Sequence, residues 1–173
     1  HSKKLFKSKK FICNQIINVG SNKYVKLKKS VHKKFKFNVL LLPEGYLSES
    51  VLLYNFVSNF LDYYKKFQFT IRLHPSLKNL SGELFKDKRI KISNKSLMQD
   101  FRSNKFSLYR GSSSIISAVN CGVVPIYYSF KNELSLDPFY GLNTNIVYNN
   151  EIKKFNKILM DNLNKNTNSN IYN

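Results

Sequence analysis

FSLYRGSSSIISAVNCGVVPIYY, residues 106–128, has the layout of a strand, a helix and a second strand in succession. The apolar run 106–109 has the length of a strand, and residues 112–121 are predicted to form a helix that Gly122 ends. The run 123–128 predicts another buried strand, where Pro125 suits a strand end or an edge better than a central position. This spacing predicts a right-handed βαβ unit with parallel strands.

The same alternation extends over most of the chain. Further strands are predicted at 37–42, 68–73, 89–92 and 145–148, and further helices at 48–67, 96–102 and 151–163. Ser48 or Ser50 is expected to cap the first of these helices and Ser96 the second. The pattern predicts an α/β fold, a three-layer, doubly wound, mainly parallel Rossmann-like sheet. We expect it to occupy residues 37–165, after a basic lead-in or interdomain hinge at 1–36 and before a frayed tail at 166–173.

Charge is the most unusual feature of the composition. The 173 residues carry a formal net charge of +19, almost all from lysine. Lysine, asparagine and isoleucine are enriched together, which favours a compositional bias of the source over a selected binding patch. A basic nucleic-acid-binding domain without catalytic activity remains a low-ranked alternative, and weak attraction to an anionic membrane face is another.

Cysteine usage and hydropathy bear on the compartment. Cys13 and Cys121 show no CxxC spacing, and Cys121 lies in an apolar helix end, as a small core residue does. The sequence has no secretory signal and no apolar run of the roughly 20 residues needed to span a bilayer. We expect a cytoplasmic protein, with peripheral contact at the inner face of the cytoplasmic membrane as a further option.

Candidate ligand-binding residues follow the predicted strands. RLHP, residues 72–75, ends one strand, so Arg72 and His74 point to the same face and Pro75 fixes the backbone of His74. An imidazole at this rim can donate a hydrogen bond to a phosphate. A turn histidine bonded to a neighbouring carbonyl explains His74 equally well, and a structural ion pair is slightly favoured for Arg72.

The second candidate segment is RGSSS, residues 110–114, which opens a helix after a strand. Gly111 lets a phosphate approach the backbone, and the hydroxyls of Ser112, Ser113 and Ser114 add to the free N–H groups of a helix start. We place Arg110 among the ligand-binding residues as well. Simple capping needs only one serine, so phosphate binding is favoured. Walker and dinucleotide motifs are absent.

Carboxylates complete the set of candidates. Glu44 follows the first strand, where it either accepts hydrogen bonds from a sugar or base or balances Arg72 or Arg110. Glu133 and Asp137 follow the fifth strand, where a carboxylate can bind a ribose; alternatively Glu133 is exposed and Asp137 caps a short helix. No carboxylate pair has a metal-binding arrangement, so no metal and no cofactor are expected.

RLHP, then YRGSSSIISAVNCGVVPIYY and ELSLDPFY, resemble the C-terminal half of bacterial surface-carbohydrate and capsule glycosyltransferases of the GT-B type. The resemblance covers about residues 37–140. It is strongest to enzymes that use CMP-activated sugars such as sialic acids, related nonulosonic acids or Kdo, whose HP and serine motifs hold the CMP phosphate. His74 and Pro75 match the HP motif, and Ser112, Ser113 and Ser114 cover the serine motif. VGSNKY (19–24) resembles a degenerate hinge motif of capsule transferases.

The resemblance implies a glycosyltransferase donor domain that binds a CMP-sugar and acts on a glycan or lipid-linked acceptor in surface polysaccharide synthesis. A CDP-glycerol-type or UDP-sugar transferase domain is the alternative. His74 and Glu44 are the candidate catalytic residues, although the catalytic acidic residue of the sialyltransferases lies in their acceptor domain. We therefore expect a separate N-terminal acceptor domain to be needed, and the fragment to be inactive alone.

Overall fold

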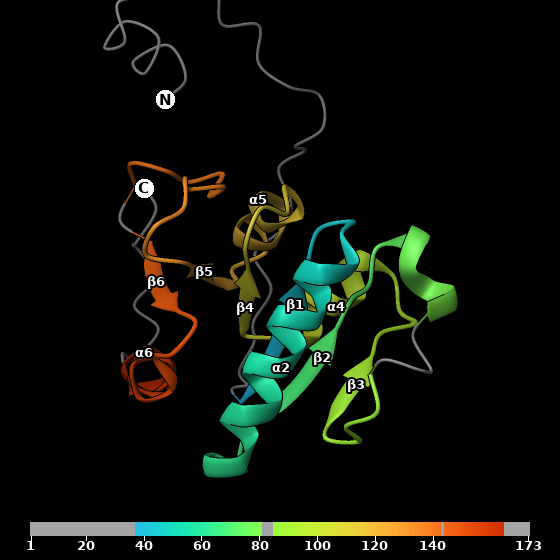
Figure 1. The fold of residues 1–173 in the computed structure, drawn as a ribbon, viewed down its shortest axis with the longest axis horizontal. Coiled ribbons are helices and arrows are strands. Elements are labelled where there is room, and N and C mark those ends of the chain that lie inside the picture. The colour runs from blue at the N-terminus through green and yellow to red at the C-terminus, as the bar shows by residue number, and fades with distance from the viewer. Residues whose placement is uncertain (1–36, 81–84, 143, 165–173) are drawn as a thin grey trace, which may run out of the picture.

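The computed structural model describes residues 37–80, 85–142 and 144–164 of the chain. The predicted lead-in and tail, Cys13 and the VGSNKY segment lie outside these ranges. Within them, a six-stranded sheet carries helices on both faces (Figure 1). Every strand pairing in this sheet is parallel, which confirms the predicted Rossmann-like α/β fold.

Strand order determines where a ligand can bind. The strands are β1 (Asn38–Leu42), β2 (Gln68–Ile71), β3 (Ile90–Ile92), β4 (Phe106–Tyr109), β5 (Val124–Ser129) and β6 (Asn145–Tyr148). Their order across the sheet is β3-β2-β1-β4-β5-β6. The chain therefore builds outward from β1 to β3, then returns to the other side of β1 and builds outward to β6. In such sheets ligands bind beyond the carboxyl ends of the strands, at this reversal.

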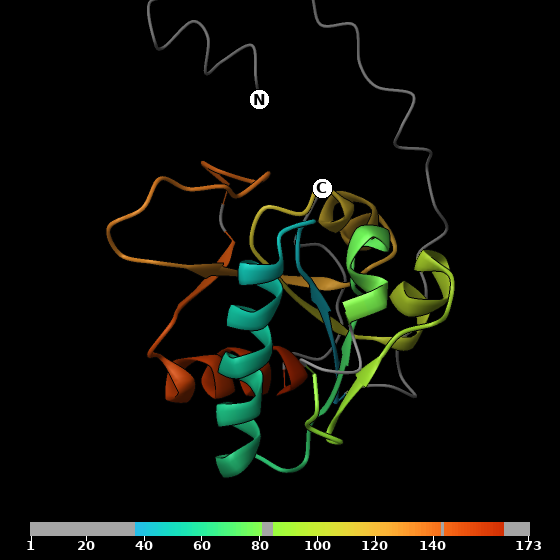
Figure 2. The same ribbon diagram turned by 45° about the vertical axis from the view of Figure 1, so that its right-hand side comes forward.

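Alternating side chains of β1 hold the two helical layers against the sheet. Val39 and Leu41 belong to a buried cluster with α2 (Leu47–Tyr63) and α6 (Ile152–Asn164). Leu40 and Leu42 belong to a second cluster with α4 (Leu97–Ser103) and α5 (Ser114–Asn120). Figures 1 and 2 show α2 crossing one face of the sheet, with α4 on the other. A continuous apolar strand is thus buried on both faces, as parallel sheets require.

Two helical details differ from the predictions. A 3-10 helix, η2 (Pro75–Leu80), follows β2 where a plain loop was expected. α2 takes Tyr46 as its N-cap residue and has no side-chain cap, so Ser48 and Ser50 were the wrong candidates. Ser50 is buried, and its Oγ donates to the carbonyl oxygen of Tyr46 at 3.2 Å. The hydroxyl is therefore used inside the first turn.

Pro125 lies near the start of β5, as expected, although β5 is not an edge strand. Its carbonyl oxygen accepts a bond from Asn145 Nδ2 at 3.3 Å, which shows that this peptide faces β6. Pairing between the two strands begins only at Ile126 with Asn145. The missing N–H of the proline thus lies just before that ladder and interrupts none of its bonds.

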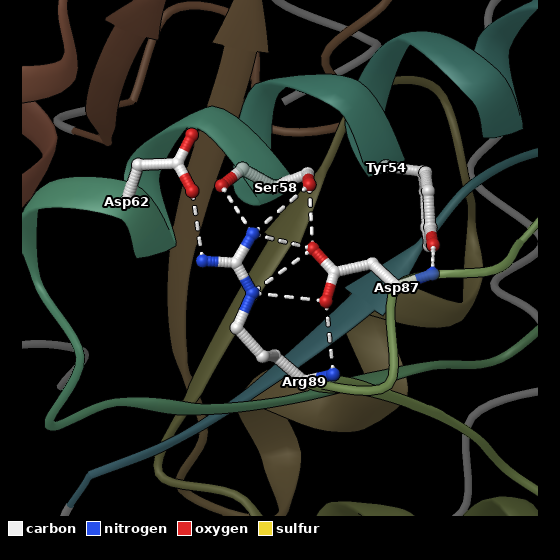
Figure 3. A network of polar contacts seen from close by, with 5 residues as sticks. All are labelled: Tyr54, Ser58, Asp62, Asp87 and Arg89. Atoms are coloured by element: carbon white, nitrogen blue, oxygen red, sulfur yellow. Dashed lines mark hydrogen bonds and ion pairs between the residues drawn. The ribbon is translucent and has the colours of Figure 1, made fainter.

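A polar network fastens the segment before β3 to α2 (Figure 3). The Asp87 carboxylate accepts bonds from Arg89 Nη2 at 2.7 Å and from Ser58 Oγ at 2.5 Å. Arg89 Nη1 also bonds Asp62 at 2.8 Å, and the Asp87 N–H donates to the Tyr54 hydroxyl. Bonding to Arg89 holds the pKa of Asp87 well below its usual range. The network ties the edge strand to the helix beside it.

Candidate functional site

A pocket of about 410 Å³ opens at the carboxyl ends of β1, β2 and β4, and we call it the rim pocket. Its walls are residues 42–45 after β1, residues 72–75 after β2, residues 111–114 after β4, and Leu97 at the start of α4. It therefore lies at the reversal of strand order between β1 and β4. The structure brings the two motifs RLHP and GSSS, far apart in the sequence, to one pocket.

His74 is exposed in the rim pocket and is oriented by Ser76. The backbone N–H of Ser76 donates to His74 Nδ1 at 3.3 Å, and the Ser76 hydroxyl lies 2.8 Å from the same nitrogen. A backbone N–H can only donate, so Nδ1 is the acceptor and the proton of the neutral ring is on Nε2. Pro75 starts η2 directly after the histidine. The ring thus keeps Nε2–H as a donor for a ligand.

The serine cluster lines the same pocket without acting as a set of helix caps. Ser113 is the N-cap residue of α5, yet its side chain makes no capping bond. The hydroxyls of Ser112 and Ser114 have no hydrogen-bond partner among the described residues. Because α5 has only seven residues, its dipole adds little. The hydroxyl groups themselves are the main polar contribution of this wall.

Glu44 forms the boundary between the rim pocket and a neighbouring one. Its carboxylate lies against the backbone of Gly111, where a β-carbon would come within 1.9 Å of Glu44 Oε1. Gly111 therefore leaves room for the Glu44 side chain, and any other residue there would displace it. The carboxylate forms no ion pair with a described residue, so it balances neither Arg72 nor Arg110 directly.

Arg72 reaches the rim pocket but is held by the fold. Its Nη1 bonds Asp100 Oδ2 at 2.8 Å and the carbonyl oxygen of Lys95 at 2.7 Å. Asp100 is 1% exposed and also accepts a bond from the Ser93 hydroxyl at 2.7 Å. A structural ion pair is thus the better supported role for Arg72, because its guanidinium is already paired with a buried carboxylate.

Arg110 and Glu133 are not in the rim pocket. They pair with each other beside a second pocket of about 250 Å³, which we call the Arg110 pocket. The Arg110 guanidinium also lies 4.7 Å from the centre of the Phe130 ring, a cation–π contact. The two pockets share only Glu44 among their lining residues. The candidate residues therefore divide between two adjoining pockets.

Glu49 is a residue of this region that the sequence analysis missed. It lies in the first turn of α2, is 8% exposed and lines the Arg110 pocket. Its Oε1 accepts a bond from the Glu44 N–H at 3.3 Å, and burial raises the pKa of the carboxyl above its ordinary value. The sequence shows only that Glu49 follows a rim loop in the first turn of a helix, where carboxylates are common.

Asp137 has a structural role. It is buried and accepts bonds from the Tyr109 hydroxyl at 2.7 Å, from the Phe139 N–H at 2.9 Å and from Thr144 Oγ1 at 3.1 Å. These bonds fix the loop between β5 and β6 to β4. The short helix that Asp137 was expected to cap is not formed: residues 138–141 are a turn, in which the Asp137 carboxylate accepts a bond from the N–H two residues on.

Among the comparisons with known proteins, similarity was found at the level of the fold. No protein-family profile matches the chain, and no curated protein matches its sequence. The crystal structure of TarM, a glycosyltransferase of the GT-B family, is similar with a TM-score of 0.57 over 82% of this chain, at 13% identity. The chain therefore shares the fold of part of TarM. It corresponds to 31% of the TarM chain.

None of the helices in residues 37–80, 85–142 and 144–164 is long and apolar enough to cross a membrane.

Proposed function

We propose that this domain binds the nucleotide-sugar donor of a glycosyltransferase, with the donor phosphate in the rim pocket. The observation that carries the proposal is the convergence of His74 and the three serines of the GSSS segment on one pocket at the reversal of strand order. That position is where sheets of this topology bind nucleotides. The fold shared with TarM supports a glycosyltransferase.

The proposed chemistry follows from the donors in the pocket. As a glycosidic bond to phosphate breaks, negative charge develops on the departing nucleotide. The ring of His74 is oriented before that charge appears, and its Nε2–H is a donor of the kind that lowers the barrier when it is held in place. The hydroxyls of Ser112 and Ser114 line the same pocket and would add further donors. Glu44 borders the same space and is proposed to accept a hydrogen bond from a hydroxyl of the substrate.

A more specific proposal concerns the nucleotide. The resemblance of RLHP and GSSS to HP and serine motifs supports a CMP-activated sugar, transferred to a glycan or lipid-linked acceptor in bacterial surface polysaccharide synthesis. Such a reaction would take place in the cytoplasm or at the inner face of its membrane, and would need an acceptor domain. We propose no metal for it.

Calorimetry tests this proposal. We expect CMP to bind the chain more tightly than UMP, UDP or CDP. His74→Ala should weaken CMP binding by roughly tenfold or more, because a hydrogen bond to a charged group contributes about 1.5–3 kcal/mol. Ser113→Ala should weaken it as well. Ser117→Ala, one turn further along α5 and outside the pocket, is the matched control.

The same titrations discriminate among the alternatives. Equal affinity for CMP and UMP would remove the CMP-sugar assignment, and tighter binding of UDP or CDP would favour a UDP-sugar or CDP-glycerol-type transferase. A nucleic-acid-binding domain predicts strongly salt-dependent DNA or RNA binding that survives His74→Ala. If no nucleotide binds, and salt-dependent binding of DNA or RNA survives His74→Ala, the glycosyltransferase proposal fails.

A further inference from the structure

The Arg110 pocket has hydrogen-bonding capacity that the fold does not use. Glu49 is 8% exposed and makes one hydrogen bond within the described residues, through Oε1 to the Glu44 N–H. Its Oε2 has no partner there, although the residue lines the pocket. Arg110 Nη1 is also buried without a partner among the described residues. A buried polar atom left unpaired is costly, and the residue that carries it, Arg110, lines the pocket.

Charge narrows the class of ligand. Glu44 and Glu49 form no ion pair with a described residue, and both line the pocket, so an anionic ligand would meet two unpaired carboxylates. Glu133 is already paired with Arg110. A cation would pair with the carboxylates but could accept nothing from the Arg110 guanidinium. A hydroxyl group both donates to a carboxylate and accepts from a guanidinium.

Apolar surface around the pocket indicates the rest of the ligand. Tyr46 is 70% exposed, Leu136 is 50% exposed and Leu52 is 42% exposed, and all three line the pocket. Large apolar side chains that gather in this way beside polar groups are typical of binding sites. A sugar-like ring combines hydroxyl groups at its edge with C–H groups on its faces, and both kinds of surface are matched here.

We propose that the Arg110 pocket binds an uncharged, hydroxyl-bearing ring, with Glu49 Oε2 accepting a hydrogen bond from one of its hydroxyls. The inference rests on the proposed function in one respect: the shared residue Glu44 makes the pocket continuous with the rim pocket that would hold the donor phosphate. The sugars of the CMP-activated donors named above are acids, so an uncharged ring would belong to the acceptor glycan, or to the donor's own sugar if the donor is the alternative UDP-sugar.

The experiment uses three small glycosides as probes of the full chain. Methyl glucoside is uncharged, methyl glucuronide carries a carboxylate and methyl glucosaminide carries an ammonium group, on the same ring. Binding is measured by saturation-transfer NMR, which detects millimolar affinities. We expect the glucoside to bind, and the glucuronide to bind at least about tenfold more weakly because of the two unpaired carboxylates. Equal or tighter binding of either charged probe, or no binding of the glucoside, would overturn the proposal.

Variants locate the binding. Glu49→Gln keeps the shape of the side chain and weakens its acceptor, and Tyr46→Ala removes an exposed ring; each should lower glucoside affinity at least about threefold. Asp161→Asn is the control for Glu49→Gln. It also replaces a carboxylate by an amide, but on α6 and away from the pocket. Tyr63→Ala removes a ring that is 74% exposed at the other end of α2. If the two pocket variants bind like these controls, the inference is wrong.

Competition with nucleotides and a nucleotide sugar then shows whether the bound ring stands for the donor's sugar or for the acceptor. If the ring belongs to a UDP-sugar donor, UDP-glucose displaces the glucoside while UDP and CMP do not. If it belongs to the acceptor, the glucoside remains bound when the nucleotide sugar is present. Failure of every nucleotide to bind would count against the proposed function, while the glucoside measurement would still decide this inference by itself.

Discussion

At the scale of the residue, His74 shows how a candidate ligand-binding group is oriented by its immediate neighbours. The Ser76 N–H and hydroxyl both face Nδ1, at 3.3 and 2.8 Å. Because Pro75 fixes the chain between them, this arrangement is local and needs little from the rest of the fold. Its effect is to leave the proton of the neutral ring on Nε2.

Ser76 is therefore expected to act as a positioning residue. Ser76→Ala should weaken CMP binding by roughly threefold, because one of two bonds that orient the ring is lost and the backbone N–H bond remains. Calorimetry at pH 7 measures the change, with Ser117→Ala as control. A loss as large as that of His74→Ala would show that Ser76 contacts the ligand itself.

Glu49 makes stability depend on pH in a defined direction. Burial raises the pKa of Glu49, so the folded protein holds this proton more tightly than the unfolded chain. The contribution of protonated Glu49 to the free energy of unfolding is fully present below the ordinary pKa of 4.5. It is lost as the pH rises through the pKa of Glu49 in the folded protein. Glu49→Gln should consequently raise the melting temperature at pH 7, and the gain should vanish below about pH 4. Thermal unfolding at several pH values tests this; a gain that is constant with pH would contradict it.

The residues of the candidate site were only partly predictable. His74, the serines and Glu44 were found because they follow apolar runs, and strand ends meet at one rim. The sequence could not show that Arg110 turns away from Gly111 to pair with Glu133, because that depends on side-chain direction. Glu49 was missed since a carboxylate in a first helical turn is ordinary, and only burial distinguishes it.

At the scale of the element, α4 illustrates what local signals can and cannot determine. Ser96 caps it as predicted, in a reciprocal capping box with Gln99: the Gln99 N–H donates to Ser96 Oγ at 3.3 Å, and the Ser96 N–H donates to Gln99 Oε1 at 2.9 Å. The position of the helix against the sheet depends instead on contacts with distant segments, among them the bond of Asp100 to Arg72 after β2. That contact links distant segments and has no signal in the sequence.

Two ion pairs, one with a buried carboxylate and one exposed, allow their contributions to the free energy of unfolding to be compared. Asp100→Asn should destabilise the protein by about 2 kcal/mol, because the buried aspartate pairs with a partly buried Arg72 and with Ser93. Asp62→Asn breaks the exposed bond to Arg89 and should cost less than about 1 kcal/mol. Urea denaturation of both variants measures the difference. Equal losses would mean that Asp100 does not hold α4 in place.

At the scale of the whole molecule, the alternation of strands and helices predicted a parallel Rossmann-like sheet, and the structure confirms it. Strand order was not predictable from the pattern, since β4 could extend the sheet beyond β3 or return to β1 with the same sequence periodicity. The return to β1 is what creates the rim pocket. Thus the fold class was readable from hydrophobic runs, whereas the position of the pocket required the topology.

Ligand binding should be visible in the stability of the whole domain. At a CMP concentration of 100 times its dissociation constant, binding adds about 2.7 kcal/mol, which corresponds to a rise in melting temperature of roughly 5–10 °C for a chain of this size. Differential scanning fluorimetry measures the shift. His74→Ala at the same concentration should show a smaller rise, and an unchanged melting temperature in the native chain would contradict nucleotide binding.

The strand order β3-β2-β1-β4-β5-β6 also sets a sequence of events for folding. β1 can pair with β2 early, but its other edge stays open until β3 and α4 have been passed and β4 arrives. Contacts of such long range are slow to form. The rim pocket needs loops from both sides of β1, so it assembles only when that edge closes. On the ribosome, the first half of the domain would emerge with this strand edge exposed and with no nucleotide site to stabilise it.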